Sequence, residues 1–123
     1  MPTEPRPASL ADVVRRAVEI ADPDDDDAVL GEFEAQFEDD DEPVAGVLED
    51  LPRRLEEADG AVRPVLPAPG LSVAEALVLY LAHRREELDG DADKVLRLAA
   101  RAEWHGEPPD DVRDWLQDRG VQA

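Results

Sequence analysis

The chain has 123 residues, enough for a single domain, and its 32 acidic residues against 13 basic ones give a net charge of −19. It contains no cysteine, which excludes disulfides, thiolate chemistry and cysteine-rich zinc sites. No run of about 18 apolar residues is long enough to cross a membrane, and the N-terminus lacks the basic start and apolar stretch of a signal peptide. We therefore expect no membrane partner and a cytoplasmic location.

The negative charge indicates a salty environment. Self-repulsion of this size should destabilise a compact state at low ionic strength. At molar salt the Debye length shrinks to about 3 Å, so the repulsion is screened while the carboxylates still keep the protein solvated. Every basic residue except Lys94 is an arginine, and the apolar residues are mostly alanine, valine and leucine. This composition resembles that of proteins from salt-accumulating haloarchaea, although a GC-rich genome also yields few lysines.

Periodic apolar residues argue against a disordered chain and predict about six helices. The first helix begins after Ser9 as its N-cap. Five aspartates in residues 22–27 precede the second helix, for which Asp22 is the predicted cap and Pro23 the first helical residue.

The third helical stretch, 43–60, contains Pro52, which must kink or divide it, and Gly60 marks its predicted end. Residues 61–71 hold three prolines and a glycine and predict an extended connection.

A capping box of Ser72 and Glu75 then predicts the start of a helix at 72–88 that is apolar on nearly every side. The fifth helix, 92–105, is capped by Asp91 and closed by Gly106.

A sixth helix ends at Gly120. These elements predict an all-α fold, a single compact bundle of about six helices around the central apolar helix 72–88. Residues 1–8 should form a flexible tail before one domain over 9–120. Within that domain, the helical halves 9–60 and 72–120 are joined by the proline-rich connection 61–71.

The aspartate-rich stretches invite comparison with an EF-hand loop, which needs glycine at position 6 and glutamate at position 12. Counted from Asp22, those positions hold Asp27 and Phe33, and the stretch that starts at Asp89 fails in the same way. Both stretches precede predicted helices, whose unpaired amides and dipole favour carboxylates. We therefore expect caps with weak, diffuse cation association, and no bound metal or cofactor.

Two histidines, His83 and His105, are the only conventional general bases, and both lie near predicted helix C-termini, where the dipole favours imidazolium. No nucleophile-plus-base pattern and no glycine-rich phosphate loop accompanies them. We expect no enzymatic activity. A hydrolase-like or metal-assisted reaction around either histidine is the remaining catalytic hypothesis.

Basic residues gather on the predicted fifth helix, where Lys94, Arg97, Arg101 and His105 follow one another at spacings of three and four and form a basic stripe. This stripe is the candidate partner-binding surface for an acidic protein or a phosphate backbone. The competing interpretation is internal pairing, because Asp93 precedes Arg97 by four residues.

The favoured function is non-enzymatic protein interaction by a small adaptor, regulator or dimerising subunit, whose partner is a second copy or another protein. The alternative is a nucleic-acid-associated regulator that uses the basic stripe of the helix 92–105. A helix-turn-helix is disfavoured because the last helix begins with Asp110 and Asp111, which phosphates would repel.

Overall fold

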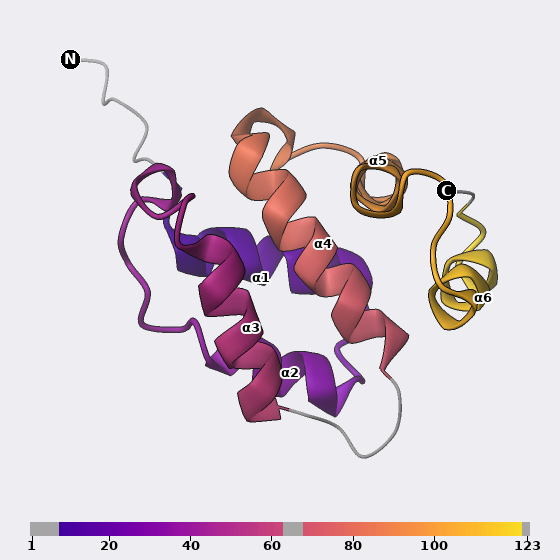
Figure 1. Cartoon of the computed structure of the whole chain (residues 1–123), viewed down its shortest axis with the longest axis horizontal. Coiled ribbons are helices and arrows are strands. Elements are labelled where there is room, and N and C mark those ends of the chain that lie inside the picture. The colour runs from indigo at the N-terminus through magenta and orange to yellow at the C-terminus, as the bar shows by residue number, and fades with distance from the viewer. Residues whose placement is uncertain (1–7, 63–67, 122–123) are drawn as a thin grey trace.

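The computed structural model describes residues 8–62 and 68–121. Within these ranges the chain forms six α-helices and two 3₁₀ turns, with no strand beyond one isolated bridge between Ser9 and Pro43 (Figure 1). The elements are α1 (Leu10–Ala21), α2 (Ala28–Ala35), η1 (Val44–Gly46), α3 (Leu51–Val62), α4 (Pro69–His83), η2 (Arg85–Glu87), α5 (Ala92–Trp104) and α6 (Asp110–Asp118). The predicted all-α bundle is confirmed.

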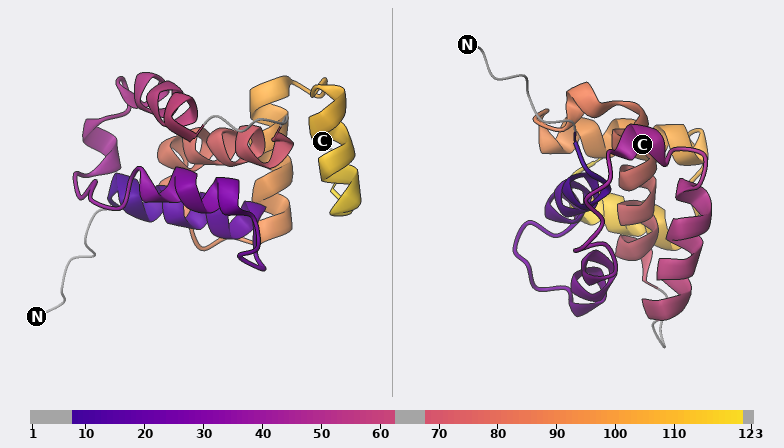
Figure 2. Two further views of the ribbon diagram at one scale, coloured as in Figure 1. Left: turned by 90° about the horizontal axis from the view of Figure 1, so that it is seen from below. Right: turned by 90° about the vertical axis from the view of Figure 1, so that its left-hand side faces the viewer.

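Helix α4 lies at the centre of the bundle and contacts each of the other five α-helices. The left panel of Figure 2 shows α1 and α2 on one side of α4, with α3 and the C-terminal half of α5 on the other side. Eight apolar side chains of α4 are buried: Leu71, Val73, Ala74, Ala76, Leu77, Val78, Leu81 and Ala82. The prediction of a central apolar helix is therefore confirmed.

The bounds of α4 differ from the predicted 72–88. The helix begins at Pro69, whose fixed φ suits the first turn, and Ser72 makes no capping hydrogen bond. It ends at His83, because the backbone of Arg84 leaves the helical region with φ −128° and ψ 62°. The predicted Ser72 capping box and the predicted end at residue 88 are both wrong.

Helix α1 begins as predicted. The hydroxyl of Ser9 accepts a hydrogen bond from the amide of Asp12 at 3.1 Å, and the Ser9 amide donates to the Asp12 carboxylate at 3.1 Å. This reciprocal capping box satisfies two amides that the first turn leaves without helical partners. The helix then buries one face, which includes Leu10, Val13 and Val14.

The aspartates of residues 22–27 form a turn before α2, and Asp27 rather than Asp22 caps that helix. The carboxylate of Asp27 accepts from the amides of Val29 and Leu30 at 3.0 and 3.4 Å. The carboxylate of Asp22 is buried and accepts from the amides of Asp26 and Asp27 at 3.2 and 3.0 Å. The prediction that Asp22 caps α2 and that Pro23 opens it is wrong, because Asp22 closes the turn instead.

Helix α3 confirms that a proline divides the stretch 43–60. Pro52 lies in the first turn of α3, where a missing amide donor costs no helical hydrogen bond, and η1 lies before it. The helix continues through Gly60 to Val62, so the predicted end at Gly60 is wrong. Gly60 does not adopt the left-handed backbone that ends a helix.

The last two helices begin and end close to their predicted positions. Asp91 caps α5 by accepting from the amide of Lys94 at 3.0 Å. His105 adopts a left-handed φ of 53° and ends the helix one residue before the predicted 105, and Gly106 follows with φ 87°. Gly120, with φ 72°, follows α6 in the same way.

Most of the predicted tail 1–8 and part of the predicted connection 61–71 fall on residues 1–7 and 63–67, which lie outside the described residues. At their edges, the carbonyl of Ala8 accepts from the amide of Val44 at 3.0 Å. Residues 61 and 62 belong to α3, and residues 69–71 belong to α4. The ordered helices therefore extend into both ends of the predicted connection.

Candidate functional site

The basic stripe predicted from the sequence lies on the surface. Lys94, Arg97 and Arg101 are exposed on α5, and the exposed His105 follows as its C-cap. None of these four side chains forms an ion pair with a carboxylate in the part of the chain that the structure describes. Internal pairing, such as Asp93 with Arg97, is therefore not observed.

Residues of the basic stripe border two separate hollows. Lys94 and Arg97 border a hollow of about 320 Å³ together with Asp91, Asp93 and residues 120–121. Arg101 borders a different hollow, between α5 and α4. The four basic residues thus follow one helix but do not converge on one site.

Two adjoining hollows follow the exposed face of α4, and we call them together the α4 groove. They have volumes of about 510 and 470 Å³ and share Ala76, Leu79 and Glu103. The first is lined by Pro52, Leu55, Glu56 and Asp59 of α3, Ser72, Glu75, Ala76 and Leu79 of α4, Glu103 and Trp104 of α5, and Pro109, Asp111 and Val112. The second is lined by Ala76, Leu79, Tyr80 and His83 of α4, Arg84, and Leu98, Ala99, Arg101, Ala102 and Glu103 of α5.

Apart from Glu103, the middle of the α4 groove is apolar. Leu79 and Tyr80 of α4 and Leu98 of α5 are half-buried, and Ala102 of α5 is exposed. Helix α4 is apolar on nearly every side, and its neighbours leave this part of its surface in contact with solvent. Burial of apolar side chains at the bottom of an open groove by a partner lowers the free energy, so it favours binding.

One end of the α4 groove is acidic and surrounds Glu75. Burial raises the pKa of Glu75 to about 8, helped by the charge of Asp59, a hydrogen bond between these two side chains, and the charge of Glu103. Glu56 of α3 and Asp111 of α6 line the same hollow. At neutral pH Glu75 therefore keeps its proton at this end of the groove.

The other end of the α4 groove is basic. His83 and Arg84, at the C-terminal end of α4, line it together with Arg101 of α5, and all three side chains are exposed. None of the three pairs with a carboxylate of the described ranges 8–62 and 68–121. The groove thus runs from an acidic end over an apolar middle to a basic end.

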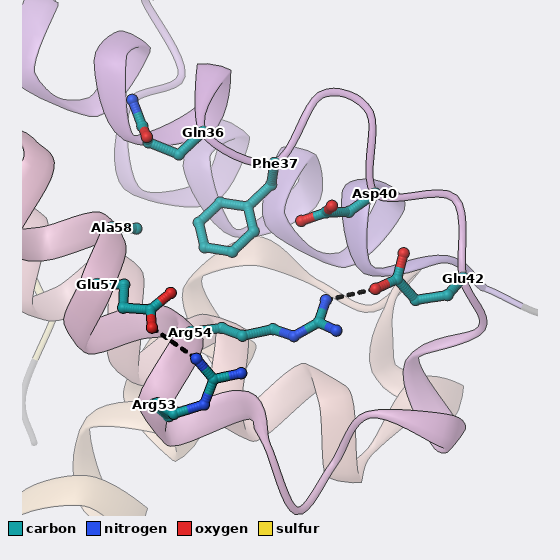
Figure 3. A pocket seen from close by; sticks show the side chains of 8 residues that line it. All are labelled: Gln36, Phe37, Asp40, Glu42, Arg53, Arg54, Glu57 and Ala58. Atoms are coloured by element: carbon teal, nitrogen blue, oxygen red, sulfur yellow. Dashed lines mark hydrogen bonds and ion pairs between the residues drawn. The ribbon is translucent and has the colours of Figure 1, made fainter.

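A third hollow of about 410 Å³, between α2 and α3, is shown in Figure 3. Its two arginines already have partners. Arg54 binds Glu42 and Asp50, the latter at 3.0 Å, while Arg53 binds Asp50 at 2.6 Å and Glu57 at 2.5 Å. Hydrogen bonds from Arg53 and Arg54 lower the pKa of Asp50 to about 2. The charged residues that line this hollow form a structural ion-pair network, which joins α3 to the segment before it.

The histidines and carboxylates do not assemble into a metal centre in the described ranges. No group of three or more histidine, aspartate or glutamate side chains there is arranged to hold a metal ion. His83 lines the α4 groove, and His105 lies at the end of α5. In the same ranges, no helix combines the length and the apolar character that a membrane span requires.

The acidic end and the apolar middle of the α4 groove were not identified in the sequence. A signal was present, because Glu75, Leu79 and His83 follow at intervals of four on a helix that is otherwise nearly all apolar. Asp59 gave no such signal, since only the packing of α3 against α4 brings it to Glu75. No protein-family model, curated protein or solved structure matches the chain.

Proposed function

We propose that the chain is a non-enzymatic protein-interaction domain, an adaptor or regulator that binds a protein partner through the α4 groove. The observation that carries this proposal is the apolar middle of the groove, where Leu79, Tyr80 and Leu98 are left half-buried between two charged ends. Protein interfaces combine an apolar centre with a polar rim in this way.

The basic end strengthens the choice of a protein partner. On a chain with a net charge of −19, His83, Arg84 and Arg101 gather at one end of the groove without described carboxylate partners. A partner that carries carboxylates there meets opposite charge, whereas the rest of this acidic chain repels it. The charges of the groove therefore favour one docking position and one orientation of the partner.

We also propose that the domain is halophilic and works in the cytoplasm of a salt-accumulating cell, with clustered carboxylates that associate diffusely with cations. The support is the excess of 32 acidic over 13 basic residues. Screening at molar salt removes the repulsion that such a chain exerts on itself and on an acidic partner.

A capture experiment with two matched variants tests the proposed function. Tagged protein is mixed with cell extract in about 1 M potassium chloride, where the Debye length is near 3 Å, with and without nuclease. Ala102→Glu places a carboxylate at the apolar middle of the groove and should abolish capture of a stoichiometric protein partner. Ala61→Glu adds the same charge at an exposed position of α3 outside the groove and should retain capture.

Circular dichroism of both variants checks that the helices remain folded. A partner that binds Ala102→Glu as well as it binds the wild type contradicts the use of the groove. An eluate without any stoichiometric protein, together with a wild type that does not self-associate, contradicts the interaction function.

A second candidate function is nucleic-acid binding by the basic stripe, which is favoured by one observation: Lys94 and Arg97 are exposed and unpaired with any described carboxylate. The net charge of −19 and the neighbouring Asp91 and Asp93 oppose it. Lys94→Glu with Arg97→Glu should abolish nucleic-acid retention if this candidate is correct. Both residues lie outside the α4 groove, so protein capture should be unchanged.

A further inference from the structure

The two ends of the α4 groove carry opposite charges along a single line of residues on α4. Glu75 lies at the acidic end, Leu79 in the apolar middle and His83 at the basic end. They follow at intervals of four residues, so Glu75 and His83 each lie about 6 Å along the helix axis from Leu79, on one face. A two-fold rotation about Leu79 therefore exchanges the acidic end with the basic end.

This order makes the surface complementary to itself. In an antiparallel pair, Arg84 and Arg101 of one copy meet Glu56 and Asp59 of the other copy, and the same contact is repeated across the axis. The apolar middle of one groove meets the apolar middle of the other.

The shape of the surface suits such a pair. In the left panel of Figure 2, the C-terminal half of α5 rises beside α4, and we call this half of α5 the ridge. Arg101 and Ala102 belong to this ridge and also border the groove. A two-fold rotation therefore places the ridge of each copy against the groove of the other.

The negative charge of the remaining surface favours contact between two copies through this face. Two chains that each carry −19 repel one another in most orientations, and the repulsion weakens when opposite charges face each other. Added salt screens the long-range repulsion, while contact between apolar side chains is retained.

We propose that the occupant of the α4 groove is a second copy of this chain, docked antiparallel about a two-fold axis near Leu79. This inference rests on the proposed function, because it names the partner of the same groove.

Sedimentation equilibrium of the full chain provides the first test. It is carried out in about 0.5 M potassium chloride, where a Debye length of roughly 4 Å leaves contacting ion pairs only partly screened. We expect the wild type and Ala61→Glu to form a dimer, and Ala102→Glu to raise the dimer dissociation constant at least tenfold. A monomeric wild type, or a dimer that tolerates Ala102→Glu, overturns the proposal.

A charge exchange provides the second test, with one double variant for each end of the groove. The first, Arg84→Glu with Arg101→Glu, makes the basic end acidic. The second, Glu56→Arg with Glu103→Arg, makes the acidic end basic, and all four residues are exposed.

Each double variant alone brings like charges together and should be monomeric, with its helices intact by circular dichroism. A mixture of the two restores opposite charges at both contacts and should form a heterodimer with close to the wild-type dissociation constant. A mixture that stays monomeric overturns the two-fold arrangement.

Failure of this inference is distinguishable from failure of the proposed function. A monomeric wild type that still captures a different protein, lost only in Ala102→Glu, leaves the proposed function in place and overturns the second copy as occupant. A partner that ignores Ala102→Glu contradicts the use of the groove altogether.

Discussion

Glu75 on α4 and Asp59 on α3 line the same hollow, and the carboxyl group of Glu75 faces the charges of Asp59 and of Glu103 on α5. Neighbouring carboxyl groups repel one another when both are ionised, so this arrangement favours the protonated form of Glu75. Burial and the charges of Asp59 and Glu103 hold the pKa of Glu75 at about 8, so Glu75 keeps its proton at neutral pH.

Stability should therefore depend on the ionisation of Glu75. The pKa of Glu75 is raised from 4.5 to about 8 in the folded state, so its contribution to stability is present in full below pH 4.5 and is lost as pH rises through about 8. Glu75→Gln mimics the protonated form. We expect it to exceed the wild type in unfolding free energy by about 1 to 2 kcal/mol near pH 9, a value discounted for partial solvent screening.

Urea unfolding at several pH values checks this prediction. Below pH 4.5 the wild type and Glu75→Gln should differ little, because Glu75 is then mostly protonated in the unfolded as well as in the folded protein. Glu32→Gln, at an exposed position of α2, is the matched control. A difference between wild type and Glu75→Gln that does not vary with pH contradicts the raised pKa of Glu75.

Arg16 connects α1 to the segment between η2 and α5. Its Nε donates to the carbonyl of Leu88 at 2.8 Å, and a second guanidinium nitrogen donates to the carbonyl of Gly90 at 3.1 Å. Arg16→Ala removes both bonds and should lower the unfolding free energy by about 1 to 3 kcal/mol.

Arg15→Ala is the control for the loss of the two Arg16 hydrogen bonds. The guanidinium of Arg15 pairs with Asp12 at 2.6 Å at a largely exposed position. An exposed pair contributes less than about 1 kcal/mol, so thermal unfolding should show a much smaller loss than for Arg16→Ala. Equal losses in the two variants would contradict a role for the Leu88 and Gly90 carbonyls.

The buried carboxylate of Asp22 should matter far more than its exposed neighbours. Asp22→Ala leaves the amides of Asp26 and Asp27 without their acceptor and should cost about 1 to 3 kcal/mol of unfolding free energy. Asp24→Ala removes the same charge at an exposed position and should change stability by less than about 0.5 kcal/mol. Urea unfolding of both variants at molar salt separates the turn contacts from the loss of charge.

Salt should stabilise the fold. The net charge of −19 acts against the compact state at low ionic strength, and a Debye length of about 3 Å at 1 M removes most of that repulsion. We expect helicity or the melting temperature, measured by circular dichroism, to rise with potassium chloride up to molar concentration. A protein that is equally stable without salt would contradict the halophilic interpretation.

Local signals in the sequence determined the fold class and several helix ends. Ser9 and Asp91 cap α1 and α5 as predicted, and Gly106 and Gly120 follow α5 and α6 with left-handed backbones. These features depend on contacts within one or two turns, which sequence spacing specifies. The apolar run of α4 likewise required a central position, because a helix that is apolar all round must be covered by others.

Where two nearby residues could each mark the start of a helix, only the tertiary structure decided between them. Asp22 and Asp27 are both able to cap a helix, and Asp27 does so because the burial of Asp22 in the preceding turn commits its carboxylate there. Pro69 and Ser72 both mark helix starts, and the helix begins at Pro69. The spacing of residues alone does not rank two such signals when both satisfy the local rules.

The α4 groove is likewise formed only by the packing of separate helices. Asp59 and Glu75 are sixteen positions apart in the sequence and meet because α3 and α4 pack together, with Glu103 arriving from α5. The basic stripe was visible as a spacing on one helix, but the structure divides it between two hollows. The sequence alone determined the helices and their charge, whereas the tertiary structure decided which side chains share a surface, because that depends on how separate helices are arranged in space.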